Sequence, residues 1–508
     1  MKRSSSFFAA VVATSLLAGC NLAPTYTRPT VDTPARYGEA SASSAGPDGS
    51  VWHEARPGDQ VDRGSWWSLY GDSTLDGLES RVRISNQTIR AAEANFRAAR
   101  AAVTVARSAL WPTLGMGSSF SRLHASRTVE NSSGVLPSGN GAAAVNTYSL
   151  QFDASYELDL WGRVRNEAAA SAANAEASAA DLATALLSIH AELAQDYFQL
   201  RALDTERQIL TDTVASYRVS LKQTRALYRA GLDSEEEVAR AETQLNTAIA
   251  QSTDLGVARA AYEHAIAVLI GQPPARFHLA AAPLTARPPV IPAGVPADLL
   301  QRRPDIAAAE RRVAAANAQI GIARTAWFPQ LTLGAVGGWQ SSSSVQWFDW
   351  PSRIWSAGPQ LAQVLFDGGA VKAGTEEIRA AYDQAAANYR QTVLTAFQSV
   401  EDNLAAVRIL DEEARQQHAA VMSARHLLDL ANTRFKLGID SYLNVITAQT
   451  ALLSNRETEV QITTRRLVAS VALIKALGGG WNTAELSTLG RAASPNAGSG
   501  SDGAPHKG

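Results

Sequence analysis

Side chains that could perform catalysis or bind a metal ion are scattered along this sequence and form no recognised motif. The 508 residues contain no Gly-x-Ser-x-Gly elbow, no His-Glu-x-x-His pair and no phosphate-binding glycine-rich loop ending in Lys. The eight histidines are dispersed, and the carboxylate run Glu235–Glu237 opens a predicted helix, where negative charge complements the helix dipole. We therefore predict no catalytic residue, no metal site and no cofactor, and we do not expect an enzyme.

The only cysteine, Cys20, has a distinctive position. Two basic residues open the chain, and residues 7–18 form an apolar stretch that is too short to span a membrane, as in a secretory signal. The stretch ends in Leu17-Ala-Gly-Cys20, which resembles the bacterial lipobox. In that motif the signal is removed before the cysteine and the thiol is lipidated.

This pattern predicts a signal peptide over residues 1–19 and a lipidated, extended segment over 20–65, with Cys20 as the lipidation site. Asn21 follows the cysteine, whereas Asp at that position is the usual signal for retention in the inner membrane. We therefore predict sorting to the outer membrane through an acyl anchor. The alternative is an ordinary signal peptide with a chance cysteine.

Charge and hydropathy argue against a nucleic-acid-binding protein and against a helical membrane protein. The formal net charge is −2, which gives no electrostatic reason to bind nucleic acid. No apolar run reaches the ~20 residues that a membrane-spanning helix needs. Strands of a membrane β-barrel are short and only half apolar, so the composition remains compatible with them.

The chain consists of two copies of one unit. A shift of 217 positions aligns Arg107–Leu114 with Arg324–Leu331, and a shift of 207 aligns Gly231–Ser234 with Gly438–Ser441. A proline-rich strip lies between the copies and breaks regular structure. We predict repeat 1 over 66–282, a linker over 283–296, repeat 2 over 297–481 and a flexible tail over 482–508.

Each copy is predicted to contain two long helices joined by a tight turn. Residues 163–229 contain neither proline nor glycine and are rich in good helix formers, so this helix would be ~100 Å long. Glycine tolerates the left-handed conformation that ends helices, and Asp or Ser caps the next one. The predicted helices are 163–229, 233–270, 370–436 and 440–477. The predicted turn residues are Gly231, Asp233, Ser234, Gly438, Asp440 and Ser441.

Each copy also contains a predicted β-hairpin, at about 113–160 and about 330–366. Residues 148–160 alternate strictly between apolar and polar side chains, which is the signature of a strand with two different faces. Seven of the 11 tryptophans lie in or beside these hairpins, and aromatic residues at strand ends are typical of membrane interfaces. The alternative is a soluble antiparallel sheet with its apolar face on a core.

Four strands per chain require several chains if they lie in lipid, because lipid does not tolerate open sheet edges. Two chains give eight strands, whose interior side chains fill, whereas three chains give twelve and leave a lumen. We therefore predict an α+β membrane protein built from two tandem repeats. Its fold is a trimeric twelve-stranded outer-membrane β-barrel with four strands per chain, continued by a long α-helical periplasmic barrel.

The sequence resembles the TolC-like outer membrane efflux family, in particular its NodT-type lipoprotein branch. The blocks that carry the resemblance follow the family's order: Leu17–Cys20, Trp66–Tyr70, Asp159–Arg163, Pro296–Ile306, Trp327–Leu331 and Phe366–Gly369. The resemblance implies a homotrimeric outer-membrane channel that extends into the periplasm and serves as the passive exit duct of a tripartite efflux pump. Its partners would be a periplasmic adaptor (membrane fusion) protein, an inner-membrane transporter and outer-membrane lipid, with no nucleic acid.

The cargo implied by the resemblance is drugs or other small toxic compounds. Two alternatives remain open. One is a duct dedicated to a single cargo such as a metal ion or a metabolite. The other, from a different class, is a structural coiled-coil lipoprotein that tethers the layers of the envelope.

The resemblance also points to a gate at the periplasmic tip. The family's tip aromatic matches Phe435 and its constricting leucine matches Leu443. Two further gate positions, often Asp and Arg in the family, fall on Thr447 and Thr450, so a charged latch is not expected there. A hydrophobic constriction can gate by dewetting. The predicted turn residues become candidate adaptor contacts by the same resemblance, whereas Phe435 and Leu443 could equally serve plain interhelix packing.

Overall fold

The computed structural model describes residues 21–39, 65–124, 144–289, 291 and 299–481. The predicted signal peptide, Cys20 and the predicted tail lie outside these residues. The helices are η2 (Trp66–Tyr70), α2 (Ser73–Ser85), α3 (Gln87–Ser108), α4 (Arg163–Arg229), α5 (Glu235–Leu269), η3 (Pro274–Arg276), α6 (Leu299–Arg302), α7 (Pro304–Thr325), η5 (Trp350–Ser352), α8 (Ala370–Lys436) and α9 (Tyr442–Ala476). The strands are β1 (Thr113–Leu123), β2 (Val145–Leu158), β3 (Gln330–Ser341) and β4 (Arg353–Ala362).

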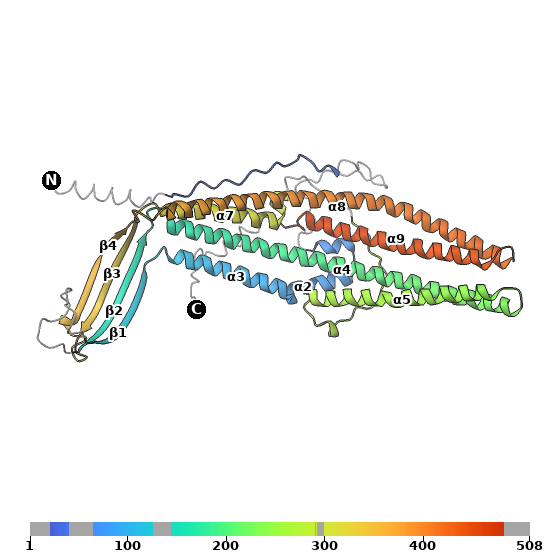
Figure 1. Cartoon of the computed structure of the whole chain (residues 1–508), viewed down its shortest axis with the longest axis horizontal. Helices are drawn as coiled ribbons and strands as arrows, with labels where there is room; N and C mark the ends of the chain where they lie inside the picture. The colour runs from blue at the N-terminus through green and yellow to red at the C-terminus, as the bar shows by residue number, and fades with distance from the viewer. Residues whose placement is uncertain (1–20, 40–64, 125–143, 290, 292–298, 482–508) are drawn as a thin grey trace, which may run out of the picture. The chain divides into compact units, whose positions relative to one another are not determined.

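The two longest helices among the described residues, α4 and α8, have 67 residues each (Figure 1). A carboxylate caps the start of each helix. The carboxylate of Asp159 accepts hydrogen bonds from the backbone N–H groups of Val164 and Arg165, at 3.1 and 2.9 Å. Asp367 accepts from Gly369 and Val371 at 2.8 and 2.7 Å. Each carboxylate therefore satisfies N–H groups that the first helical turn leaves unpaired. The corner before α8 begins soon after β4, which ends at Ala362 rather than near 366.

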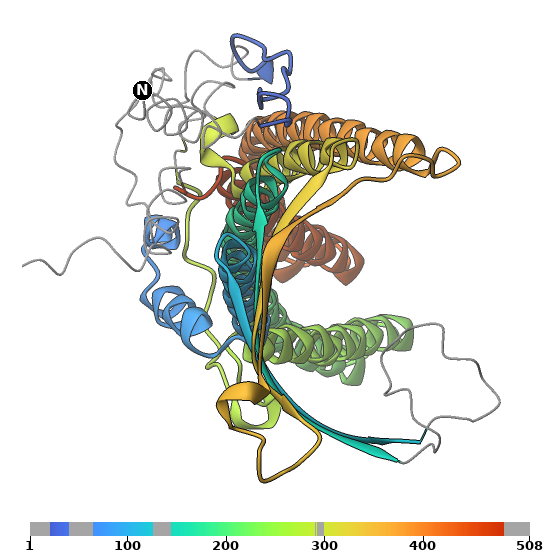
Figure 2. The ribbon, with the colours of Figure 1, turned by 90° about the vertical axis from the view of Figure 1, so that its left-hand side faces the viewer.

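The four strands form one antiparallel sheet in the order β1-β2-β3-β4, seen as a continuous curved ribbon in Figure 2. The register gives the sheet two different faces. Apolar and aromatic side chains from all four strands share one face: Leu114, Met116, Phe120, Tyr148, Leu150, Phe152, Leu331, Leu333, Trp339, Trp355 and Leu361. Polar side chains share the other: Thr113, Ser119, Gln151, Asp153, Glu157, Thr332, Gln340, Ser356 and Gln360.

No described residue of the single chain covers the apolar side chains at the two edges of the sheet. Leu114 and Trp355, on the two edge strands, are 84% and 83% exposed. Among the described residues, β1 and β4 each pair with a neighbouring strand on one side only. Exposed apolar area and unpaired strand edges are both unfavourable in water, so this sheet needs further partners on its face and at its edges.

The chain divides into two compact units, and each takes residues from both repeats. The first comprises Met1–Pro29, Arg97–Glu176 and Glu310–Asn388 and contains the sheet. The second comprises Thr30–Phe96, Ala177–Ala309 and Tyr389–Gly508 and contains most of the long helices. Within the described ranges, no helix combines the length and the apolar character that a membrane crossing requires.

In the second unit, the four long helices share an apolar cluster. Its buried members come from α4, α5, α8 and α9: Leu221, Ala241, Ala431, Tyr442, Val445 and Ala448. Half of these are alanines, and such small side chains let the helix backbones approach closely. The cluster lies near the turns that join α4 to α5 and α8 to α9, so packing of all four helices positions those turns.

A buried ionic network holds the segment after α5 against α4 and α5. Arg259 donates to the carboxylate of Asp204 at 2.7 Å and to the carbonyl of Leu279 at 2.7 Å. Arg201 donates to the carbonyl of Ala280 at 2.7 Å, and the N–H of Ala282 donates to Asp204 at 3.1 Å. The charges are paired and also bind backbone groups, as buried ions must be to persist.

Candidate functional site

The candidate site centres on the two tip turns, defined as residues 230–234 between α4 and α5 and residues 437–441 between α8 and α9. A glycine in each, Gly231 or Gly438, has a positive φ of 71° or 70°. Its N–H donates to the carbonyl three residues earlier, and the next N–H donates to the carbonyl five residues earlier, at 2.9–3.0 Å. This pair of bonds defines the Schellman ending of a helix, which requires the left-handed conformation that glycine favours.

The two tip turns differ in how they continue into the next helix. In the first, the hydroxyl of Ser234 caps α5 by accepting from the N–H of Glu237 at 3.3 Å. In the second, Asp440 binds Arg434 and Asn444 at 2.9 and 2.6 Å. The Arg434 guanidinium, followed by Asn444, holds the pKa of the Asp440 carboxyl below its usual range. An ion pair therefore stabilises the second tip turn, whereas a serine N-cap stabilises the start of the helix that follows the first.

Phe435 and Leu443, the two candidate constriction residues, have different surroundings. The ring of Phe435 packs against Tyr442, with centroids 5.5 Å apart, at the margin of the four-helix cluster. This placement corresponds to interhelix packing. Leu443 is 41% exposed on α9 and lines a cavity, so its side chain is available to a neighbouring surface.

Thr447 and Thr450, one helical turn apart on α9, also differ. The Thr447 hydroxyl donates to the carbonyl of Leu443 in its own helix at 2.9 Å. The Thr450 hydroxyl accepts from the side-chain amide of Gln244 in α5 at 2.7 Å, and the same amide lies 3.0 Å from the hydroxyl of Tyr217 in α4. Gln244 therefore links α4, α5 and α9 through uncharged hydrogen bonds, and Thr450 takes part in this link while Thr447 does not.

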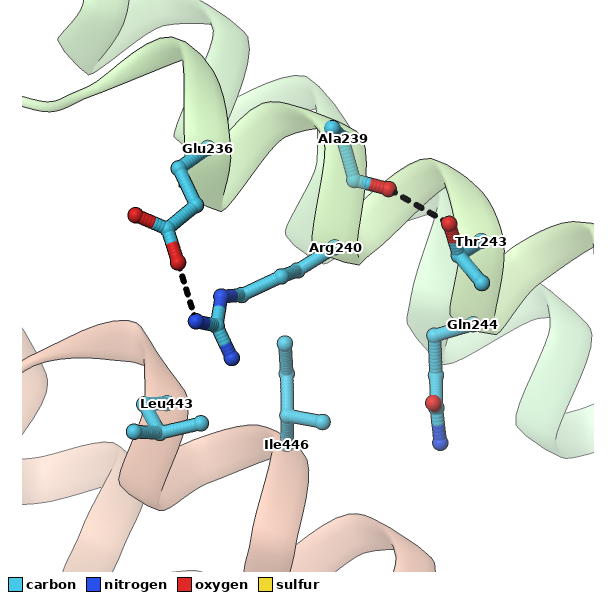
Figure 3. A pocket seen from close by; sticks show the side chains of 7 residues that line it. All are labelled: Glu236, Ala239, Arg240, Thr243, Gln244, Leu443 and Ile446. Carbon is cyan, nitrogen blue, oxygen red and sulfur yellow. Dashed lines mark hydrogen bonds and ion pairs between the residues drawn. The ribbon is translucent and has the colours of Figure 1, made fainter.

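A cavity of about 440 Å³ lies between α5 and α9 beside this link. Figure 3 shows Arg240 and Gln244 of α5 reaching toward Leu443 and Ile446 of α9. Arg240 forms an ion pair with Glu236, one turn earlier in α5. The charged side chains that line this cavity therefore come from α5, whereas α9 contributes the apolar side chains of Leu443 and Ile446.

Some polar groups between the helices are left without partners. The hydroxyl of Thr224 and the side-chain oxygen of Gln449 are buried and make no hydrogen bond among the described residues. Each such group costs roughly 1–3 kcal/mol because it has lost its hydration. This part of the helix packing is therefore less stable than an apolar seam of the same shape would be.

The segment that follows the predicted lipidation site is stabilised by hydrogen bonds and close packing. Asn21 accepts from the side chain of Asn166 at 2.9 Å and from the N–H of Ala23 at 3.0 Å. A Cβ on Gly321 would lie 2.6 Å from the Cβ of Ala23, so only glycine leaves room for the segment there. Cys20 itself lies outside the described residues, and its lipidation stays a prediction.

Sequence reasoning did not select Gln244 or Arg240. Both lie on a helical stretch with ordinary polar composition, and the α9 residue that Gln244 bonds, Thr450, is 206 positions away in the chain. The only local signal was the Glu236–Arg240 spacing of four residues, which is common on helix surfaces. No cluster of His, Cys, Asp and Glu in the described part of the chain could hold a metal ion.

A protein family and individual relatives match this chain over most of its length. Residues 78–272 and 295–479 match the family described as outer membrane efflux protein. The pyoverdine export outer membrane protein OpmQ of Pseudomonas aeruginosa is 32% identical over 440 residues, which cover 85% of this chain and 91% of that protein. The toluene efflux pump outer membrane protein TtgC of Pseudomonas putida is 31% identical over 483 residues, covering 94% and 96%.

The fold has solved counterparts. The outer-membrane channel OprN superposes with a TM-score of 0.81 at 28% identity, and the match covers 91% of this chain and 100% of OprN. The similarity therefore extends over nearly the whole of both proteins.

Proposed function

The chain belongs to the outer membrane efflux protein family, and we propose that three copies of it form the passive exit duct of a tripartite efflux pump. Family membership confirms the resemblance predicted from the sequence, the fold class, the role in efflux and the outer-membrane location. The trimer, the partner proteins, the gate and the cargo are the parts that we propose.

The two-faced sheet supports the trimer. Its apolar face matches a lipid environment and its polar face matches a water-filled lumen, which is the pattern of a membrane barrel. The free edges of β1 and β4 must pair if the sheet lies in lipid. Three four-stranded sheets joined edge to edge give twelve strands and an open interior. The chain would then bind a periplasmic adaptor and an inner-membrane transporter, which supplies the energy, and would catalyse no reaction.

The candidate gate is an uncharged one. Gln244 bridges Tyr217 and Thr450 and so fastens α9 to the α4–α5 pair, while Leu443 supplies an apolar side chain beside the bridge. A neutral hydrogen bond contributes ~1 kcal/mol, so its loss shifts a closed-to-open ratio about fivefold. Opening would also hydrate Thr224 and Gln449, which lowers its cost.

The cargo that we propose is small toxic organic compounds. Relatives that are 32% and 31% identical are named for pyoverdine export and for toluene efflux, so the shared architecture accommodates chemically different molecules. A strain that lacks the gene should become sensitive to several unrelated organic toxicants. Sensitivity to one metal salt, or retention of one metabolite, would instead support a dedicated duct.

The test of the duct itself is conductance of the purified protein in planar bilayers, with subunit number measured by sedimentation in detergent. We expect a trimer with low conductance. Thr450→Val should raise the conductance because it removes the acceptor for Gln244 without changing shape, and Leu443→Ser should raise it by hydrating the constriction. Thr447→Val is the matched control, because its hydroxyl bonds only within its own helix.

The outcomes separate the alternatives. A monomer in detergent, or a trimer without conductance in every variant, would contradict the duct and favour an envelope tether. Equal conductance of the Thr450→Val, Thr447→Val and unmodified proteins would leave the duct intact but remove Gln244 and Thr450 from the gate.

A further inference from the structure

Residues Trp66–Tyr70, one of the sequence blocks that carry the family resemblance, form the short helix η2. The proposed duct gives this helix no role. Its aromatic side chains are buried. The ring of Trp67 stacks on the imidazole of His190 in α4, with centroids 4.5 Å apart and planes at 21°. The hydroxyl of Tyr70 lies 2.7 Å from that of Ser470 in α9. This short helix therefore contacts one long helix from each repeat.

The helix that follows, α2, contacts α4 at the same place. The hydroxyl of Tyr197 donates to Asp72 at 2.6 Å, and Asp72 also caps α2 through the N–H groups of Thr74 and Leu75. Farther along α2, the carboxyl group of Glu79 contacts the imidazole of His190. Both η2 and α2 thus converge on the His190 side chain.

The contact between Glu79 and His190 is short and buried. The Glu79 side chain is 0% exposed and that of His190 is 12% exposed, and the Oε2 to Nδ1 distance is 2.6 Å. The second carboxyl oxygen of Glu79 has no hydrogen-bond partner among the described residues. An oxygen and a nitrogen this close must have a proton between them, because two facing lone pairs would repel.

The surrounding charges decide which group carries that proton. Burial, and then the Asp76 carboxylate, raise the pKa of Glu79, whereas burial, and then the Arg83 guanidinium, lower the pKa of His190. Both charged neighbours lie on α2, and the residues of η2 carry no charge. An ion pair would place a carboxylate near Asp76 and an imidazolium near Arg83, so the neutral pair is favoured.

We propose that Glu79 and His190 form a proton-binding site. The proton stays on the Glu79 carboxyl, which donates a hydrogen bond to Nδ1 of neutral His190. This hydrogen bond keeps η2 packed against α4 and α9. Loss of this proton leaves a fully buried carboxylate beside an uncharged His190, where the Asp76 carboxylate repels it. The Trp67–His190 stack then separates, and η2 is released from the two repeats. The site binds a proton and is independent of the conducted cargo.

Infrared spectroscopy tests where the proton is. The protonated carboxyl of Glu79 should give a carbonyl stretching band at neutral pH that Glu79→Gln removes, because the amide keeps the shape and a donor to Nδ1 but has no carboxyl. Glu376→Gln, at a side chain that is 75% exposed, is the matched control and should leave the band unchanged. No difference band between the unmodified protein and Glu79→Gln would overturn the proposal.

Fluorescence of Trp67 tests whether the proton seats η2. The signal, taken as the difference from Trp67→Phe, should change at alkaline pH in the unmodified protein and stay constant in Glu79→Gln. Asp76→Asn removes the neighbouring negative charge and should move the alkaline change to lower pH, which provides a test even if Glu79→Gln does not fold. A Trp67 signal with the same pH profile in all three proteins would refute the role of the proton.

Discussion

Replacing Glu79 with glutamine should change how the stability of the protein depends on pH. Burial, with a contribution from Asp76, raises the pKa of Glu79 from its ordinary 4.5 to about 9. A raised carboxyl pKa means that the folded protein binds the proton more tightly than the unfolded chain does. Its stabilising contribution is therefore fully present below pH 4.5 and is lost as the pH rises toward 9.

The magnitude follows from a pH window in which Glu79 titrates but its partner His190 does not. Burial and Arg83 lower the pKa of His190 from 6.5 to about 4, so its contribution is complete above pH 6.5 and is lost only toward acid. From pH 6.5 to 9, each pH unit removes ~1.4 kcal/mol of the Glu79 contribution, or ~3 kcal/mol over the window. For a chain of this size that corresponds to ~3 °C in melting temperature.

Circular dichroism melting at a fixed scan rate between pH 6.5 and 9 measures the effect. The melting temperature of the unmodified protein should fall by ~3 °C relative to that of Glu79→Gln across this range. Glu376→Gln, which alters an exposed carboxyl, should run parallel to the unmodified protein. Parallel curves for Glu79→Gln and the unmodified protein would show that Glu79 is ionised in the folded state and would refute the reasoning.

Three further substitutions test the packing. Thr224→Val removes a buried hydroxyl that lacks a partner and should stabilise the protein by ~1 kcal/mol, so a lower melting temperature would contradict it. Gly321→Ala places a Cβ 2.6 Å from that of Ala23 and should release the N-terminal segment to limited proteolysis, whereas an unchanged cleavage pattern would show that the segment shifts without detaching. Asp204→Ala leaves the buried Arg201 without its ion-pair partner and leaves Arg259 with Glu263 alone, so it should destabilise by ~3–5 kcal/mol, with cleavage near 279–284 as the readout. A loss below ~1 kcal/mol would mean that water replaces the carboxylate.

The sequence by itself determined the elements and their faces. The absence of glycine and proline over 163–229 predicts one uninterrupted helix, and α4 occupies those residues. Strict alternation over 148–160 predicts a strand with an apolar and a polar face, and the register of β2 with both neighbours extends those faces across the sheet. These features depend on backbone preferences and side-chain period within a short segment, so the segment alone contains the information.

Only the tertiary structure decided which side chains meet. Thr447 and Thr450 look alike in the sequence, but only Thr450 is bonded to Gln244, a residue 206 positions away. The pair Glu79 and His190 is separated by 111 positions, and neither side chain has a local pattern that points to the other. Such contacts depend on how each long helix is rotated and packed against its neighbours, which the amphipathic period of an alanine-rich helix does not specify.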